Sequence, residues 1–307
     1  MTKTAFLFPG QGSQYVGMGK DLYQAFPQAR SVYDRANDVL GMDIRKLSFE
    51  GPEDELRKTL NTQPAILVHS VAVFEILKAR GLKPELGAGH SLGEYSALYA
   101  AGSLDLDAAL RLVRRRGELM FAEGTTNPGT MASIIGLSAD AVAQLCREVP
   151  GIVVPANYNE PNQIAISGQI DAVKQAAELA KTRGAMKAIM LPVSGAFHSP
   201  LLENSAREFQ EFLKGFEIRE PSFPIVANVT GEIERTADEI RRNLEQQLIS
   251  PVQWTRTIQT ARALGFDLFY EVGPGKVLSG LVRRIDRAAN CLTLGKTEEL
   301  QHLMEES

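Results

Sequence analysis

The sequence predicts an α/β fold in which a small ferredoxin-like subdomain is inserted into a larger part with a mostly parallel sheet. Outside residues 128–194, short apolar runs alternate with helical patterns, which is typical of parallel strands covered by helices on both faces. Within 128–194 the order is strand, helix, two strands, helix and strand, which is the ferredoxin-like pattern. We therefore expect a large α/β subdomain formed by 1–127 and 195–307, with 128–194 as the insertion.

The elements follow from where apolar periodicity changes between two and about 3.6 residues and where Gly and Pro interrupt it. The first part is expected to contain a strand at 5–8, helices near 16–40 and 62–80, a short strand at 86–88, and helices at 94–101 and 105–123. The insertion is expected to contain strands at 131–137, 152–154, 163–166 and 186–193, and helices at 138–149, capped by Ser138, and 171–183. The last part is expected to contain helices at 199–214 and 238–248, strands at 225–229 and 268–272, a helix after 273–275, and a marginal polar tail at 297–307.

Composition excludes several classes of function. The 307 residues are 44% hydrophobic with a net charge of −4, which argues against bulk affinity for nucleic acid. Cys146 and Cys291 stand far apart and form no C-x-x-C pattern, so we expect a reducing compartment and no metal. No secretory signal is expected, and no apolar run approaches the roughly 18 residues of a membrane span. These features predict a cytoplasmic protein without a membrane partner. We also expect a monomer.

The most specific local feature is the pentapeptide Gly89-His90-Ser91-Leu92-Gly93, a G-x-S-x-G sequence. It lies between a predicted strand and a predicted helix, the context in which this pattern forms a nucleophile elbow. Glycines on both sides allow close backbone approach, and the helix N-terminus favours negative charge near the serine. Ser91 is therefore the candidate nucleophile; a serine in a glycine-rich loop without chemistry is the alternative.

A serine hydroxyl needs a base, and histidine is the usual one near neutral pH. Of the four histidines, His69 lies on a core-like helix, His302 lies in the polar tail, and His90 adjoins the serine in a turn where consecutive side chains diverge. His198 remains, at the point where the insertion returns to the large part. No acidic partner is visible, so the sequence predicts a serine–histidine dyad whose imidazole is oriented by a backbone carbonyl. The alternative is that His198 is purely structural.

Arg116 is the second informative residue. On a helical wheel over 105–121 it falls within the apolar arc, and an inward arginine needs a buried anion. A guanidinium matches a carboxylate with two hydrogen bonds, so the acyl group delivered to Ser91 is expected to carry a free carboxylate. An internal ion pair and a side chain that reaches solvent remain alternatives. The turn at 10–14 suits an oxyanion hole, and it lacks the third glycine of a dinucleotide fingerprint.

Five motifs stand in the chain in the same order as in one known family. They are Gly10-Gln11-Gly12-Ser13-Gln14, Gly89 to Glu94, Arg116-Gly117 with Met120, Gly195-Ala196-Phe197-His198-Ser199, and Gln247 followed by Pro251-Val252-Gln253-Trp254. Together they closely resemble the malonyl-CoA:acyl carrier protein transacylases and the acyltransferase domains of polyketide synthases, over essentially the whole chain. The resemblance implies a hydrolase-like large subdomain with a ferredoxin-like insertion.

The resemblance also implies the roles of individual residues. Ser91 would carry the malonyl group as an ester, and His198 would act as general base and then as acid. The main-chain carbonyl of Gln247 would orient His198. Backbone N–H groups of Gln11 and Leu92 would form the oxyanion hole.

Four further residues would bind the substrate according to the resemblance. Arg116 would grip the malonyl carboxylate, and Phe197 is similar to the form that selects malonyl over methylmalonyl. His90 and Asn159 would line the same site. The implied substrates are malonyl-CoA and the phosphopantetheine thiol of an acyl carrier protein, with no cofactor and no metal, in fatty acid or polyketide synthesis.

Two residues depart from the family pattern, Ser250 before Pro251 and Glu160 after Asn159, and neither is expected to touch the chemistry. Two other functions stay open. A serine esterase or thioesterase would have a late histidine, and only His302 is late enough. A non-catalytic module would use the turn at 10–14 to bind a nucleotide phosphate.

Overall fold

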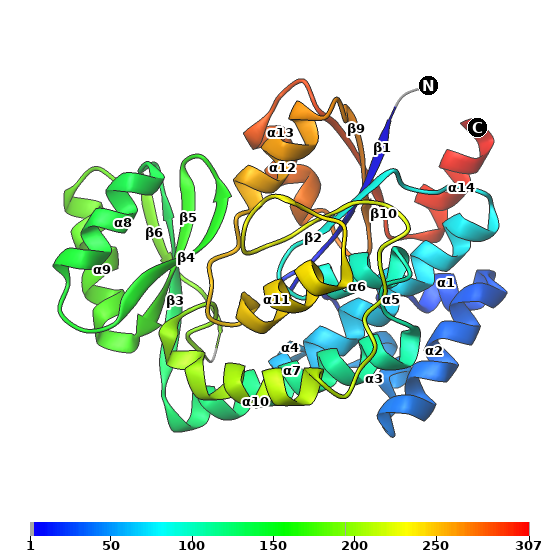
Figure 1. Cartoon of the computed structure of the whole chain (residues 1–307), viewed down its shortest axis with the longest axis horizontal. Coiled ribbons are helices and arrows are strands. Elements are labelled where there is room, and N and C mark those ends of the chain that lie inside the picture. The colour runs from blue at the N-terminus through cyan, green and yellow to red at the C-terminus, as the bar shows by residue number, and fades with distance from the viewer. Residues whose placement is uncertain (1–2, 194, 307) are drawn as a thin grey trace.

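A computed structural model describes residues 3–193 and 195–306, and these residues form two separate sheets with helices around them (Figure 1). The main sheet has the order β10-β9-β1-β2-β7-β8, and all neighbouring pairs are parallel except β7 with β8. Its strands are β1 (Thr4–Phe8), β2 (Leu86–Gly89), β7 (Ile225–Val226), β8 (Ile233–Glu234), β9 (Leu268–Val272) and β10 (Asn290–Leu294).

Helices cover both faces of the main sheet. Side chains alternate along β1, so that Phe6 and Phe8 pack against one set of helices while Ala5 and Leu7 pack into a second cluster with Trp254. The helices around the sheet and at its ends are α1 (Lys20–Ala25), α2 (Pro27–Leu40), α3 (Ile44–Glu50), α4 (Glu53–Arg57), α5 (Thr59–Ala79), α6 (Gly93–Ala100), α7 (Leu106–Thr126), the 3-10 turn η1 (Pro200–Leu202), α10 (Glu203–Leu213), α11 (Ala237–Gln247), α12 (Trp254–Ala263), α13 (Val277–Ile285) and α14 (Thr297–Glu306).

Helix α5 is long and apolar enough to cross a membrane by length and composition alone, and 89% of that stretch is buried within the molecule. We expected no such segment, because no apolar run approaches about 18 residues. The polar residues His69 and Ser70 lie within this helix. Both are fully buried, and a helix that is apolar on most sides is typical of a core position.

The second sheet is antiparallel, with the order β4-β5-β3-β6, and lies at the left of Figure 1 in green. Its elements are β3 (Gly129–Ile135), α8 (Ala139–Glu148), β4 (Val153–Glu160), β5 (Gln163–Gln169), α9 (Ile170–Thr182) and β6 (Lys187–Met190). Their order along the chain is the predicted one, and Ser138 caps α8 by accepting a hydrogen bond from Ala141 N at 3.3 Å. The predicted α/β fold class is confirmed, whereas the boundary at residue 194 falls outside the described residues.

Several expected elements differ in extent. One helix was expected over 16–40, and the chain forms α1 and α2 instead, because the residue before Pro27 disfavours helical backbone. The strand expected at 152–154 is longer, because β4 continues through Glu160 with two register shifts, so Asn159 lies on a strand. The sequence patterns also miss α3, α4, β8, α12 and β10.

The polar tail is a helix rather than a marginal segment. In α14, Leu300 and Leu303 are buried, and Thr297 N donates to the carboxylate of Asp21 at 2.7 Å. Tertiary contacts therefore stabilise a segment whose local composition is mostly polar.

Candidate active site

Ser91 occupies the sharp turn between β2 and α6. Its φ of 53° lies in the left-handed region, where non-glycine residues are uncommon. A Cβ on Gly89 would overlap the backbone of Gly93, and a Cβ on Gly93 would overlap the carbonyl of Phe8. Glycine is therefore required on both sides of the serine, which confirms the close approach expected from the sequence.

Asn228 holds this turn from the end of the neighbouring strand β7, which it follows by two residues. Its Oδ1 accepts a hydrogen bond from Ser91 N at 2.7 Å, and its Nδ2 donates to the carbonyl of Gly89 at 2.7 Å. The side chain is 2% exposed, so these bonds do not compete with solvent. We did not single out Asn228 from the sequence, although a polar residue directly after the apolar run 225–227 was the available signal.

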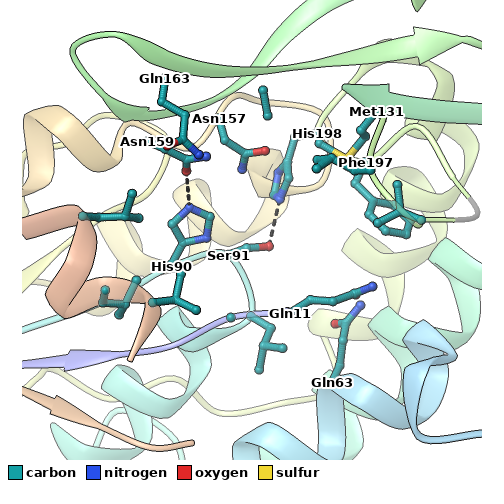
Figure 2. A pocket seen from close by; sticks show the side chains of 18 of the residues that line it. Gln11, Gln63, His90, Ser91, Met131, Asn157, Asn159, Gln163, Phe197 and His198 are labelled. Atoms are coloured by element: carbon teal, nitrogen blue, oxygen red, sulfur yellow. Dashed lines mark hydrogen bonds between the residues drawn. The ribbon is translucent and has the colours of Figure 1, made fainter. Parts of the chain in front are cut away.

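The hydroxyl of Ser91 lies 2.8 Å from Nε2 of His198 (Figure 2). Nδ1 of His198 is 2.9 Å from the carbonyl of Gln247 and 3.1 Å from that of Ser250. Carbonyl oxygens only accept hydrogen bonds, so Nδ1 carries the proton and Nε2 accepts from the Ser91 hydroxyl. The expectation that Ser250 stays apart from this site is therefore wrong for its main chain.

The imidazole of His198 is held in its neutral form. The residue is 3% exposed and adopts a left-handed φ of 57°. Burial lowers the pKa of His198 to about 3, and the positive charge of Arg116 acts in the same direction. A neutral imidazole with a free Nε2 lone pair is the form that can take a proton from serine.

Arg116 points inward from α7, as its place in the apolar arc predicted, and is 1% exposed. Its Nη2 lies 3.0 Å from the Ser91 hydroxyl, and Nη1 donates to Oε1 of Gln63 at 2.6 Å. Nε donates to Oε1 of Gln247 at 3.2 Å. Burial lowers the pKa of the Arg116 guanidinium, yet an arginine remains charged in proteins.

No carboxylate pairs directly with Arg116 within residues 3–193 and 195–306. Neutral amides hold two of its nitrogens, and the third faces the Ser91 hydroxyl. The internal ion pair and the solvent-reaching side chain, both left open by the sequence, do not describe this residue. A buried cation held by neutral groups is suited to a substrate anion.

The backbone N–H groups of Gln11 and Leu92 lie in the two turns next to Ser91. Gln11 follows β1, and Leu92 directly precedes α6. In the described part of the chain, no oxygen accepts a hydrogen bond from either N–H. The side chain of Gln11 is fixed through Oε1, which accepts from Thr59 Oγ1 at 2.7 Å.

These groups open into a cavity of about 230 Å³ between the two sheets. Ser91, His198 and Arg116 form one side, and Phe197 adds an aromatic ring that is 6% exposed. The second sheet forms the facing wall, and α13 borders the cavity. The wall residues from the second sheet are Met131, Asn157, Asn159, Gln163 and Ala165.

His90 lies in the same cavity without facing the dyad. Its Nε2 is 2.8 Å from Oδ1 of Asn159 (Figure 2), and its ring centroid is 5.4 Å from that of Trp254. Burial lowers the pKa of His90. His90 therefore joins the serine turn to the second sheet through Asn159.

The other two histidines are remote from this cavity: His69 is buried in α5, and His302 borders a separate pocket beside α14. Among the described residues, no three His, Cys, Asp or Glu side chains are grouped to hold a metal ion.

Comparisons with known proteins agree on one family. The model of the acyl transferase domain matches residues 5–299. The malonyl CoA-acyl carrier protein transacylase of Bacillus subtilis (strain 168) is 43% identical over 304 residues, covering 98% of this chain and 96% of that protein.

Two solved structures carry the same fold. One is a malonyl-transacylase in complex with its type II PKS acyl-carrier protein, with a TM-score of 0.97, 42% identity and complete coverage of both chains. The other is a malonyl-CoA:acyl carrier protein transacylase from Xanthomonas oryzae pv. oryzae, with a TM-score of 0.96 and 41% identity over 100% of this chain and 99% of that one. The resemblance seen in the sequence is thus confirmed, and this chain belongs to the acyl transferase domain family, among the malonyl CoA-acyl carrier protein transacylases.

Proposed function

We propose that this protein transfers a malonyl group from malonyl-CoA to the phosphopantetheine thiol of an acyl carrier protein, through a malonyl ester on Ser91. One observation carries the proposal. The Ser91 hydroxyl lies 2.8 Å from a neutral imidazole nitrogen and 3.0 Å from a buried guanidinium that pairs with no carboxylate in the described residues. A nucleophile and an anion site side by side suit an acyl group that ends in a carboxylate.

In the first half-reaction, Oγ of Ser91 attacks the thioester carbonyl carbon while Nε2 of His198 takes the hydroxyl proton. The C=O bond becomes a C–O⁻ bond, and the backbone N–H groups of Gln11 and Leu92 stabilise this oxyanion. The C–S bond then breaks, and the CoA sulfur leaves with the proton from His198. The low pKa of His198 makes its protonated form a strong donor at this step.

In the second half-reaction, the phosphopantetheine thiol gives its proton to Nε2 of His198 and its sulfur attacks the ester carbonyl. The C–O bond to Ser91 breaks, and Oγ recovers the proton from His198. The product is a malonyl thioester of the carrier protein, and the enzyme returns to its starting state, as a ping-pong mechanism requires. The carbonyl of Gln247 keeps the imidazole in the tautomer that both halves use.

Substrate selection follows from the cavity walls. Arg116 binds the malonyl carboxylate, because its guanidinium matches a carboxylate with two hydrogen bonds. Phe197 crowds the carbon between the two carbonyl groups and disfavours an α-methyl group. His90 and Asn159 fix the opposite wall by their mutual hydrogen bond.

The other functions considered from the sequence receive less support. An esterase with a late histidine would need His302, which borders a different pocket. A phosphate-binding function of the turn at 10–14 would not explain the hydrogen bond between Ser91 and His198. We also propose that the enzyme acts as a cytoplasmic monomer without a cofactor, and that 128–194 is the inserted unit; light scattering on the purified protein tests the monomer.

Intact-mass measurement after incubation with malonyl-CoA tests the proposed function. We expect wild type to gain one malonyl group and to lose it again when holo-acyl carrier protein is added. Ser91→Ala gains none, because the hydroxyl that lies beside His198 is removed. Ser96→Ala, which removes a buried serine from the helix that follows the Ser91 turn, keeps the adduct. A malonyl adduct on Ser91→Ala contradicts the assignment.

A further inference from the structure

Glu94 is a buried carboxylate that touches none of the proposed reacting atoms. It stands in the first turn of α6, three residues after Ser91, and is 1% exposed. A carboxylate taken out of water is costly unless hydrogen bonds replace its hydration. The partners of Glu94 therefore indicate what this charge does.

The two carboxylate oxygens of Glu94 accept hydrogen bonds from the turn after β7 and from the last residue of α11. One oxygen accepts from Asn228 N at 2.9 Å, and the other accepts a short bond from Nε2 of Gln247. Asn228 is the residue whose side chain holds Ser91 N and the carbonyl of Gly89. Gln247 is the residue whose carbonyl holds Nδ1 of the dyad histidine.

Two chains of hydrogen bonds thus meet at Glu94, one leading to Ser91 and the other to His198. Gln247 closes the loop, because its Nε2 also donates to the carbonyl of Ser91 at 3.0 Å. The serine and histidine are 107 residues apart in the sequence, and this network joins the backbone of Ser91 to the imidazole of His198.

The donors and acceptors around it fix the orientation of the Gln247 amide. Its NH₂ faces Glu94, and its oxygen accepts from Nε of Arg116. The reverse orientation would place the NH₂ against the guanidinium and the amide oxygen against the carboxylate, so both contacts would become repulsive. Without the carboxylate, only Arg116 and the carbonyl of Ser91 would select this orientation.

Other buried carboxylates do not make such a link. Glu123 is bonded to Asn127 and Ser205, and Glu271 accepts from the backbone N–H groups at the start of α13. Neither, within the described residues, contacts a group that holds Ser91 or His198.

We propose that Glu94 is a positioning residue that aligns Ser91 with His198 by holding Asn228 and Gln247 at the same time. The role of Glu94 in malonyl transfer rests on the proposed function, but the alignment of Ser91 with His198 can be measured without any acyl donor. The test is Glu94→Gln, which keeps the shape of the side chain. A glutamine places an NH₂ against one of the two N–H donors, so one chain of bonds is broken.

We expect the rate at which a fluorophosphonate labels Ser91 to fall about 10- to 100-fold in Glu94→Gln, as for a small misplacement of reacting groups. The NMR resonance of the His198 Nδ1 proton shifts, because the carbonyl of Gln247 moves. Glu123→Gln is the matched control: it also replaces a buried carboxylate, and it leaves both the labelling rate and the resonance unchanged.

Wild-type labelling together with an unshifted resonance in folded Glu94→Gln overturns the proposal. Should that variant fail to fold, Glu94→Asp keeps the charge on a shorter arm that cannot reach both donors, and wild-type labelling of Glu94→Asp overturns the proposal equally. The two proposals can fail separately. If Glu94→Gln loses labelling but the wild type takes up no malonyl group, only the proposed function is contradicted.

Discussion

The two sheets of this molecule contribute to the cavity in different ways. Ser91, Gln11 and Asn228 each follow the carboxyl end of a strand in the main sheet, and β1, β2 and β7 are neighbours there. Carboxyl ends of adjacent parallel strands meet at one edge, where ligand sites of α/β folds commonly form. The antiparallel sheet instead presents side chains from strand interiors, such as Met131 and Ala165.

Hydrogen bonding follows the same division. Around the main sheet, buried polar groups hold one another in a connected network that includes Glu94, Gln247 and Arg116. The antiparallel sheet has an apolar core of its own between its strands and α8 and α9, and it reaches the serine turn through the contact of Asn159 with His90. We propose that the loops of the main sheet set the geometry of bond making, whereas the antiparallel sheet sets the shape of the cavity.

The largest effect on activity is expected for His198→Ala. Removal of the proposed general base should lower the rate of malonyl transfer by about 10³-fold, measured as malonyl-carrier protein formed over time. His302→Ala, which alters a histidine beside a separate pocket, should retain wild-type activity. A nearly normal rate for His198→Ala would contradict the proposed role of His198 as the general base.

Arg116→Ala is expected to have the next largest effect, and a selective one. Losing a charge-assisted bidentate contact should cost at least about 2 kcal/mol for malonyl transfer, roughly 30-fold, with a smaller loss for acetyl transfer. Competition between malonyl-CoA and acetyl-CoA measures the ratio, and Arg115→Ala on the exposed side of the same helix is the control. Equal losses for both acyl groups contradict a role in carboxylate binding.

Asn159→Ala tests the contribution of the antiparallel sheet and should have a modest effect. Loss of its hydrogen bond to His90 is worth about 1 kcal/mol, so kcat/KM should fall about fivefold. Asn162→Ala, in the exposed turn that follows the same strand, serves as the control. A loss as large as that of His198→Ala would show that the wall takes part in the chemistry.

Ile164→Ala should have the smallest effect on activity. Ile164 is fully buried in the core of the antiparallel sheet, and truncation should lower the free energy of unfolding by about 2–5 kcal/mol. Fluorophosphonate labelling of Ser91 below the unfolding transition should remain at the wild-type rate. If the labelling rate of Ser91 fell together with the free energy of unfolding, the core of the antiparallel sheet would also affect the geometry around Ser91.

Residues in short motifs could be predicted from the sequence, because a local pattern marks them. The turn at Ser91 and the inward face of Arg116 follow from glycine spacing and helical periodicity. Asn228 and Glu94 could not be connected in this way, because their hydrogen bond joins residues 134 positions apart. The helical tail was mispredicted for a related reason, since the burial of Leu300 depends on contacts with the core rather than on its neighbours in sequence.

The left-handed backbone at both Ser91 and His198 has a consequence for how this enzyme would lose activity. Such conformations cost on the order of 1–3 kcal/mol each and persist only while their surroundings impose them. Loosening of the loops around the two residues would let each relax toward a commoner conformation and carry its side chain away from the other. Inactivation by mild denaturant or heat should therefore precede global melting, so that residual secondary structure would be a poor measure of how much working enzyme remains.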